Sequence, residues 1–303
     1  MQPPRFPLVL IALALAVFAC DLPGAAPPTP FSIPTPNQTL TAIFAPTAVT
    51  TIAPPPTSEG LPTVAVTPAE TLAALATATT AGLSRPNGTP VEAVLLTTAP
   101  TIDGDLAEWT TNAYPMTQVT FGASRWSGLA DASAVFYMGW DDSRLYVAAR
   151  VTDDKFVQVS KGEALYLGDS LEIQFDANLA ADFGATSLSS DDYQLGLSPG
   201  NFGLLAAQSY LWYPTTKSGV PAGVVVAGKS SSSGYTVEAA IPWAVFGVVP
   251  AEASRYGFAI SVSDNDAAGT AAQQSLVSSV STRTLIDPTT WGTLALEGPS
   301  GGS

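Results

Sequence analysis

The chain contains few of the residue types that usually carry catalysis. None of its 303 residues is a histidine, so Ser-His-Asp and Cys-His nucleophile arrangements and imidazole-bound zinc are excluded. Cys20 is the single cysteine, which excludes an intrachain disulfide framework and a metal site built from several cysteines. Carboxylates and aromatic rings are the next candidates for a functional site.

Glycoside hydrolysis requires two carboxylates at a set separation across a cleft. The sequence offers Glu172 with Asp176, or Glu238, for that role. However, Glu172, Gln174 and Asp176 alternate with apolar residues, as on the polar face of a strand, and such a face needs no catalytic explanation. No motif brings an acid and a nucleophile together, so we expect the chain not to be an enzyme.

Calcium binding is suggested by the acidic run at 264–266 (DND), which resembles the first half of a calcium-binding loop. Calcium is a hard cation that prefers oxygen ligands, and carboxylates supply them. Ala268 and Ser275 stand where an EF-hand would place ligands, so this loop is not an EF-hand. We predict Asp264 and Asp266 as ligands of Ca2+; a solvated turn, in which aspartate is common, is the alternative.

Strands would have to position these side chains, because period-two alternation of apolar residues recurs along the second part of the chain. The clearest unit is Ser133 to Asp154, in which two apolar runs flank the turn-forming residues 141–144 (DDSR). β-branched and aromatic residues alternate within each run, so the stretch predicts a β-hairpin. Both of its strands carry apolar side chains on both faces, which is typical of a sheet packed against a second layer.

Further alternating runs follow the hairpin, with turn residues between them, and no window of useful length shows an amphipathic helix. The runs lie at 170–176, 192–197, 204–212, 224–226, 235–241, 258–262 and 294–296. Many short alternating strands separated by turns are typical of a sandwich or a barrel. We therefore predict an all-β domain over residues 93–297, followed by a flexible tail at 298–303.

The N-terminal part of the chain has the composition of an export signal. Residues 1–19 contain one charge and a short apolar run, which predicts a signal peptide. Cys20 follows directly, and residues 17–20 (VFAC) resemble the lipobox of bacterial lipoproteins, with Phe18 where a small residue is usual. A cysteine that happens to end an ordinary signal peptide is the alternative. We predict lipid on Cys20, which would hold the secreted chain on the outer face of the bacterial cell membrane.

Residues 20–92 are rich in proline, threonine and alanine. Such a composition predicts a disordered linker that holds the folded part away from the membrane. The net charge of the whole chain is −14, so nucleic acid or an anionic membrane surface would repel it. We therefore expect no nucleic-acid partner, and contact with the membrane only through the lipid anchor.

Five strings in the predicted domain resemble, in the expected order, the motifs of carbohydrate-binding module family 9 and its DOMON-like relatives. They are IDGDLAEW (102–109), WDDSRLYV (140–147) with VTD (151–153), GDSLEI (168–173), GYTVEAAIPW (234–243) and DPTTWGTL (287–294). The resemblance covers nearly all of residues 95–297. It implies an antiparallel β-sandwich of about ten strands. It also implies a non-catalytic role in which paired aromatic side chains clamp a sugar and calcium ions support the loops.

Two tryptophans outside those strings are the candidate clamp. The other four lie inside the strings, where we expect them to pack into the core: Trp109, Trp140, Trp243 and Trp291. A flat ring can cover the apolar face of a sugar while polar neighbours bind its hydroxyls. Trp126, with Arg125 beside it, and Trp212, with Tyr210 and Tyr213 beside it, offer that combination. The alternative is that both rings simply cover the ends of the sandwich.

These features together predict a non-catalytic, extracellular carbohydrate-binding lipoprotein. It would display a sugar-binding β-sandwich at the cell surface on a flexible linker, with a polysaccharide or oligosaccharide as its partner. The alternative is a surface structural or protein-interaction β-sandwich that keeps the fold and has lost sugar binding.

Overall fold

The structure, a computed structural model, describes residues 82–299, and these form 14 strands with only short helical segments. The strands are β1 (Val91–Leu95), β2 (Ala113–Met116), β3 (Gln118–Phe121), β4 (Ala132–Trp140), β5 (Arg144–Asp153), β6 (Ser170–Asp176), β7 (Asp192–Ser198), β8 (Gln208–Tyr213), β9 (Val225–Ala227), β10 (Ser230–Ser231), β11 (Gly234–Pro242), β12 (Arg255–Asp264), β13 (Ser275–Ser278) and β14 (Gly292–Glu297). The helical segments are η3 (Gly162–Leu167), η4 (Thr215–Lys217), α4 (Trp243–Phe246) and η5 (Pro288–Thr290). The prediction of a mostly β domain is confirmed.

The strands join into one mixed sheet that is nearly closed. Its main path runs β10-β11-β5-β4-β1-β14-β12-β6-β7-β8. Most neighbours are antiparallel, but β1 runs parallel to both β14 and β4. The expectation of a purely antiparallel sandwich of about ten strands is therefore wrong in both respects. Strands of two to four residues are too short to show a period, and strand direction depends on where the chain returns in space.

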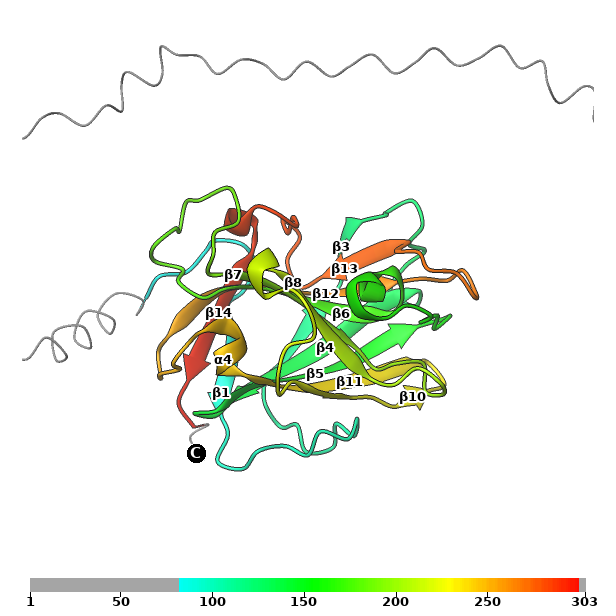
Figure 1. Cartoon of the computed structure of the whole chain (residues 1–303), viewed down its shortest axis with the longest axis horizontal. Helices are drawn as coiled ribbons and strands as arrows, with labels where there is room; N and C mark the ends of the chain where they lie inside the picture. The colour runs from blue at the N-terminus through cyan, green and yellow to red at the C-terminus, as the bar shows by residue number, and fades with distance from the viewer. Residues whose placement is uncertain (1–81, 300–303) are drawn as a thin grey trace, which may run out of the picture. The chain divides into compact units, whose positions relative to one another are not determined.

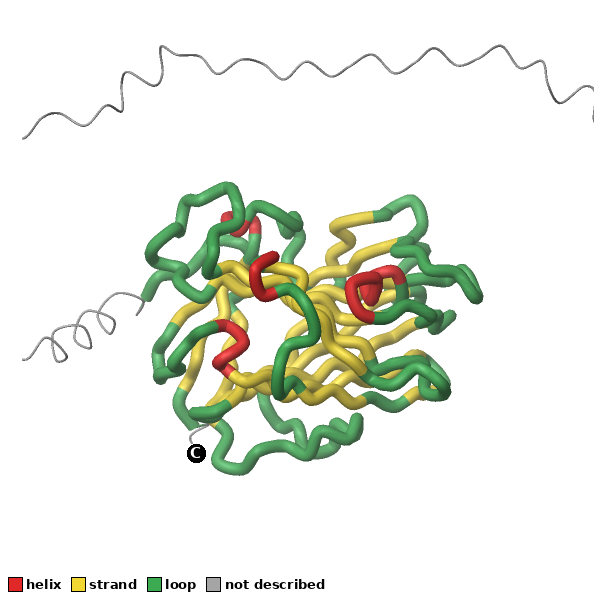
Figure 2. The backbone as a smooth tube through the Cα atoms, in the orientation of Figure 1, coloured by secondary structure: helices red, strands yellow, loops and turns green. Residues whose placement is uncertain are grey.

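Two layers of this sheet face each other across the core. β4, β5 and β11 form one layer, and β12, β6, β7 and β8 form the other, with β1 and β14 joining them (Figures 1 and 2). The predicted hairpin is confirmed as β4 and β5, which pair from Ala132 with Asp153 to Trp140 with Leu145. Within residues 82–299, no helix is both long enough and apolar enough to cross a membrane.

Aromatic side chains fill much of the space between the layers. Phe175 of β6 stacks on Phe246 of α4 with ring centroids 4.2 Å apart. Phe136 of β4 and Phe258 of β12 belong to opposite layers, and their ring centroids lie 6.4 Å apart. The four tryptophans expected in the core are all buried, and each indole N–H donates to an oxygen: Trp109, Trp140, Trp243 and Trp291. A buried indole with its N–H paired is the stable state for that side chain.

β6 is the strand that matters most for the candidate site. The alternation of Leu171, Ile173 and Phe175 with polar residues predicts a half-buried strand, yet all seven of its residues are buried. The apolar side chains enter the core. The polar side chains on the other face lie beneath segments that return from far along the sequence. The structure thus covers a strand face that sequence alone predicts to be exposed.

The predicted signal peptide and Cys20, the predicted site of lipidation, lie outside the described residues, as does most of the predicted linker. Residues 82–92, which composition assigns to that linker, are described and lie against the domain. Arg85 is buried there, and β1 begins at Val91. The chain is therefore already part of the packed structure before the first family-like string begins.

Candidate functional site

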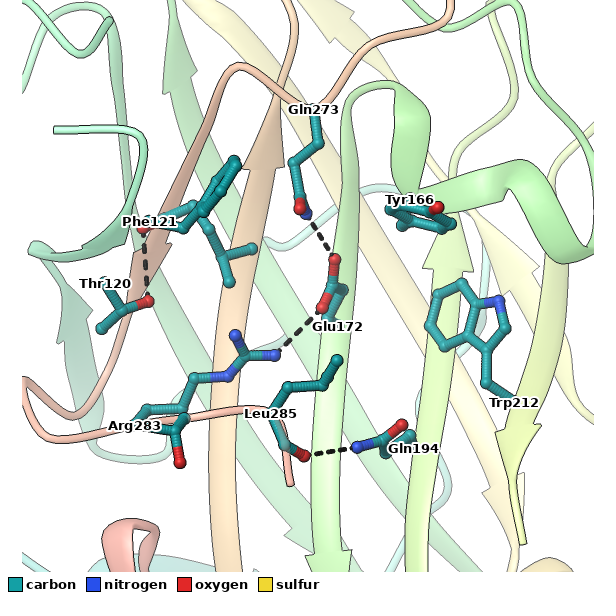
Figure 3. A pocket seen from close by; sticks show the side chains of 11 residues that line it. Thr120, Phe121, Tyr166, Glu172, Gln194, Trp212, Gln273, Arg283 and Leu285 are labelled. Carbon is teal, nitrogen blue, oxygen red and sulfur yellow. Dashed lines mark hydrogen bonds and ion pairs between the residues drawn. The ribbon is translucent and has the colours of Figure 1, made fainter. Parts of the chain in front are cut away.

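A pocket of about 600 Å3 opens over the polar face of β6 and β7 (Figure 3). Its lining comes from β3, η3, β6, β7, β8, β13 and the segments around Gln273 and Arg283: Thr120, Phe121, Tyr166, Glu172, Gln194, Trp212, Gln273, Leu276, Arg283, Thr284 and Leu285. More of this lining is apolar than polar. A concave, mainly apolar pocket with a few converging polar groups is the usual form of a small-ligand site.

The floor of the pocket is a buried ion pair. Arg283 donates from Nη2 to Glu172 Oε2 at 3.1 Å, and its Nε donates to Gln174 Oε1 at 3.1 Å. Gln273 Nε2 donates to the other oxygen of Glu172 at 2.7 Å. Burial raises the pKa of Glu172, and the positive charge of Arg283 acts in the opposite direction. The floor therefore carries both donors and acceptors while its net charge stays near zero.

Aromatic rings stand on both sides of this floor. Phe121 lies on one side and is 53% exposed, and Trp212 lies on the other side with Tyr166 next to it (Figure 3). The Tyr166 and Trp212 rings meet edge to face, with centroids 6.0 Å apart and planes at 80°. A ligand that enters the pocket would lie between two apolar faces and above a polar floor.

Contacts on two sides fix the indole of Trp212. Its Nε1 donates to the carbonyl oxygen of Glu163 at 2.8 Å. Its ring lies directly over Gly196 of β7, where a Cβ atom would come within 2.3 Å of the ring. Glycine is required there because any side chain would push the indole out of place.

The structure separates the predicted clamp residues. Trp212 lines the pocket, and the ring of Tyr210 lies 6.1 Å from it without lining the pocket. Trp126 lies in the loop between β3 and β4, outside the pocket lining, and its Nε1 donates to the carbonyl oxygen of Ala132 at 2.8 Å. Arg125 is exposed beside it, and Tyr213 also lies outside the lining. The ring placed opposite Trp212 is therefore Phe121 rather than Trp126.

Sequence reasoning missed most of the pocket. Phe121 and Tyr166 stand in a four-residue strand and a 3-10 segment, neither of which shows a periodic signal. The sequence offers Glu172 only as a catalytic acid or as part of the polar face of a half-buried strand, and neither interpretation predicts a ligand pocket. One feature of the sequence could have indicated the pocket. Two side chains with several hydrogen-bonding atoms, Glu172 and Gln174, alternate with a fully apolar set.

The predicted metal ligands come together with carboxylates from two other parts of the chain. Asp264 and Asp266 lie with Asp131 so that one oxygen of each is within 4.8 Å of the others, and Asp266 also groups with Asp153 and Asp154. Asp131 follows the Trp126 loop, and Asp153 ends β5. The cluster therefore joins the start of β4 to the ends of β5 and β12, which are distant in sequence.

The cluster fits a calcium ion on the chemistry of its donors. Asp264 is 1% exposed, and its Oδ2 accepts from Ser275 Oγ at 2.8 Å, whereas its Oδ1 has no partner among the described residues. Burial raises the pKa of Asp264 to about 7 and that of Asp153 to about 6. Buried carboxylate oxygens without a partner are costly, and a hard cation would satisfy them.

Comparison with known proteins identifies the family independently of the structure. Residues 102–299 match the family model described as "Carbohydrate family 9 binding domain-like". The chain is similar over 170 residues to endo-1,4-beta-xylanase A of Thermoanaerobacterium saccharolyticum, with 32% identity; the match covers 56% of this chain and 13% of the xylanase.

Two solved structures share the fold. One is a carbohydrate binding module family 9 from Caldicellulosiruptor kristjanssonii in complex with cellotriose, at 23% identity and a TM-score of 0.54, which covers 71% of this chain and 97% of that one. The other, from the same organism in complex with glucose, has 24% identity and a TM-score of 0.52, and covers 70% of this chain and 98% of that one. At these identities the likeness concerns the fold alone.

Proposed function

The chain belongs to the carbohydrate family 9 binding domain-like family, and on that premise we propose that its pocket over β6, β7 and β8 binds a neutral oligosaccharide. The observation that carries the proposal is the position of Phe121 and Trp212 on opposite sides of the Glu172–Arg283 floor (Figure 3). The matched domain is of a non-catalytic kind. The chain covers only 13% of the xylanase to which it is similar, so the role of the whole protein is part of the proposal.

The chemistry of the pocket suits a sugar ring. The apolar faces of the ring would lie against Phe121 and Trp212, where their burial is favourable. Its hydroxyl groups would donate to Glu172 and accept from Arg283 and Gln273, so that no buried polar group is left without a partner. A negatively charged sugar would be disfavoured, because the carboxylate of Glu172 already pairs with the guanidinium of Arg283 and would repel a second anion. Two relatives were solved with cellotriose and with glucose, so β-linked glucose oligomers are the first ligands to test.

The test measures binding of cellotriose and of insoluble polysaccharides to the full chain, with Trp212→Ala and Trp126→Ala compared. Trp212→Ala should lower the affinity at least tenfold, because a buried aromatic contact at the centre of a site typically contributes about 2 kcal/mol or more. Trp126→Ala should leave the affinity within about twofold, since Trp126 lies outside the pocket. Isothermal titration calorimetry and retardation in affinity gels give the two readouts.

The results separate the candidate functions. Binding by the wild type that Trp212→Ala leaves unchanged would place the sugar elsewhere on the domain. A wild type that no polysaccharide retards would instead favour the surface structural or protein-interaction role.

We also propose that Asp131, Asp264 and Asp266 hold a calcium ion that ties their loops together. Their convergence and the unpartnered Oδ1 of Asp264 support this. The one ion pair of the three among the described residues is a long contact of 3.9 Å between Lys155 Nζ and Asp266 Oδ2, and calcium would supply further positive charge. Asp264→Asn should abolish most of the calcium-dependent rise in Tm, whereas Asp142→Asn, an exposed carboxylate in the β4–β5 turn, should retain it. An equal rise in both variants would contradict the assignment.

We further propose that the chain is exported and held on the outer face of the cell membrane by lipid on Cys20. The apolar N-terminal run and the VFAC sequence support this proposal. Mass spectrometry of the mature N-terminal peptide tests it: a diacylglyceryl modification on Cys20 is expected. An N-terminus that begins elsewhere, or an unmodified Cys20, would contradict it.

A further inference from the structure

Four aspartates gather at the ends of β6 and β7, away from the pocket. Asp176 ends β6 and pairs in register with Asp192, the first residue of β7. One oxygen each of Asp176, Asp182 and Asp191 lies within 4.8 Å of the others. We call these four side chains, Asp176, Asp182, Asp191 and Asp192, the aspartate basket.

The basket has more negative charge than the described residues compensate. Asp192 is 0% exposed and its Oδ1 has no hydrogen-bond partner among residues 82–299. Both carboxylate oxygens of Asp182 are likewise buried without a partner in that part of the chain. Burial raises the pKa of Asp176 to about 7 and that of Asp192 to about 6, with neighbouring aspartates acting in the same direction. A cation beside these oxygens would stabilise the ionised forms of the carboxylates.

Arg85 brings one cation into the basket. Its Nη2 donates to Asp176 Oδ2 at 2.9 Å, with the two side chains 1% and 0% exposed. Its Nη1 donates to the carbonyl oxygen of Pro288, and its guanidinium lies 5.9 Å from the ring centroid of Phe183. Among the ion pairs of the described residues, Arg85 is the only partner of the four aspartates.

The backbone around Arg85 is fastened to the last part of the domain. The Arg85 amide donates to Thr293 Oγ1 at 2.8 Å. Asn87 Nδ2 donates to the carbonyl oxygens of Thr289, at 2.6 Å, and Trp291, at 2.9 Å. We call residues 84–88 the strap. The strap precedes residues 102–299, which match the family model.

We propose that Arg85 is the resident cation of the aspartate basket, that it anchors the strap to β6, and that a divalent cation takes its place when Arg85 leaves. Through Asp176 the strap is joined to the end of β6, and the first half of the same strand carries Glu172 of the pocket floor. A tethered guanidinium can satisfy carboxylates with directed hydrogen bonds, and a free calcium ion can satisfy the same oxygens by coordination. The two compete because they neutralise the same carboxylates.

The first test compares Arg85→Met with the wild type as full chains. In chelator, the loss of a buried ion pair should lower Tm by about 10 °C. Calcium should then raise Tm by clearly more in Arg85→Met than in the wild type. Because both proteins keep Asp131, Asp264 and Asp266, the difference between the two calcium shifts reports the basket alone. An equal calcium shift in both would overturn the proposal.

A double variant shows where the extra calcium shift arises. Adding Asp182→Asn to Arg85→Met removes a carboxylate whose oxygens have no partner, so the extra shift should disappear. The matched control, Asp142→Asn in the same background, changes an exposed turn residue and should leave the shift intact. An extra shift that survives Asp182→Asn would place the ion outside the basket and overturn the proposal.

Hydrogen exchange of the wild type provides a test that does not require a stable variant. If calcium and Arg85 compete, amides of residues 84–88 should exchange faster as calcium is raised to tens of millimolar, while those of β4 and β5 should not. Exchange of the strap that calcium leaves unchanged or slows would overturn the competition. Sugar affinity plays no part in these tests, so they can fail while the proposed function holds, and the reverse.

Discussion

β6 carries two arginine–carboxylate pairs on the same face, and they have different surroundings. Glu172 pairs with Arg283 at 3.1 Å near the start of the strand, and Asp176 pairs with Arg85 at 2.9 Å at its end. All four side chains are buried. By residue type, distance and burial the two pairs are nearly equivalent.

The neighbours of the two pairs differ. Both oxygens of Glu172 accept hydrogen bonds, Gln174 holds Arg283, and the pair opens into a pocket with aromatic walls. Both oxygens of Asp176 also accept hydrogen bonds, from Arg85 and from the Asn178 amide. Its neighbouring carboxylates, however, include Asp182 and Asp192 with unpartnered oxygens, and Arg85 itself belongs to the strap. A buried ion pair alone therefore indicates little about function. The groups around it decide whether it receives a ligand or holds the chain.

Replacing the two arginines one at a time tests most directly whether the two pairs differ in function. Arg283→Met should lower sugar affinity by about 100-fold, because a hydrogen bond to a charged group contributes about 1.5–3 kcal/mol and Glu172 is left without its counter-ion. Arg85→Met should lower Tm but leave affinity within about twofold. Calorimetry with cellotriose at a temperature where both variants are folded measures the difference.

Arg283→Lys is the matched control for the pocket, since it keeps the charge and loses the forked geometry. We expect an affinity between those of the wild type and Arg283→Met. If Arg85→Met weakened binding as much as Arg283→Met does, the two pairs would not be functionally distinct.

A smaller effect should follow from filling the space beneath Trp212. Gly196→Ala would place a methyl group within 2.3 Å of the indole, so the ring must move and the affinity should fall about tenfold. Gly184→Ala is the matched control, because its Cβ would meet nothing within 4 Å and its backbone is not left-handed. Equal affinities in the two variants would show that the position of the indole does not determine binding.

The smallest expected effect is on the pH dependence of stability in chelator. The pKa values of Asp176 and Asp264 are raised to about 7, and those of Asp153 and Asp192 to about 6, above the ordinary value of 3.8. Folding therefore favours their protonated forms. This contribution to stability is complete below about pH 4 and is lost as the pH rises to about 7.

Scanning calorimetry in chelator should accordingly give a Tm that rises by about 5 °C as the pH is lowered from 8 to 5.5. Saturating calcium should reduce or reverse this trend, because the cation favours the ionised forms. A Tm that falls steadily on acidification in chelator would show that folding does not favour the protonated forms of these carboxylates.

Much of the fold could be predicted from local pattern. Alternation predicted β4 and β5 as a hairpin and β6 at its observed bounds, since buried strands must place apolar residues at every second position. The five family-like strings predicted the family that residues 102–299 match. The run at 224–226 predicted β9 within one residue. The short strands β2, β3 and β10 and the parallel position of β1 could not be predicted, because their pairing depends on distant partners.

The candidate site was only half predicted. Trp212 was identified because it is a large aromatic residue outside the family-like strings, and it lines the pocket. Trp126 was chosen by the same rule and lies elsewhere. Asp264 and Asp266 were predicted as a pair, and the structure adds Asp131 from a loop more than a hundred residues earlier.

The sequence by itself determined the longer strands β4, β5 and β6, the tryptophans that enter the core, and the lack of any histidine-dependent catalytic arrangement. Tertiary structure alone decided what covers the polar face of β6. Arg283 reaches Glu172 across 111 positions of sequence and Arg85 reaches Asp176 across 91. Alternation reports that a strand has a polar face, but only the return of distant segments in space determines whether that face meets water, a pocket or another part of the chain.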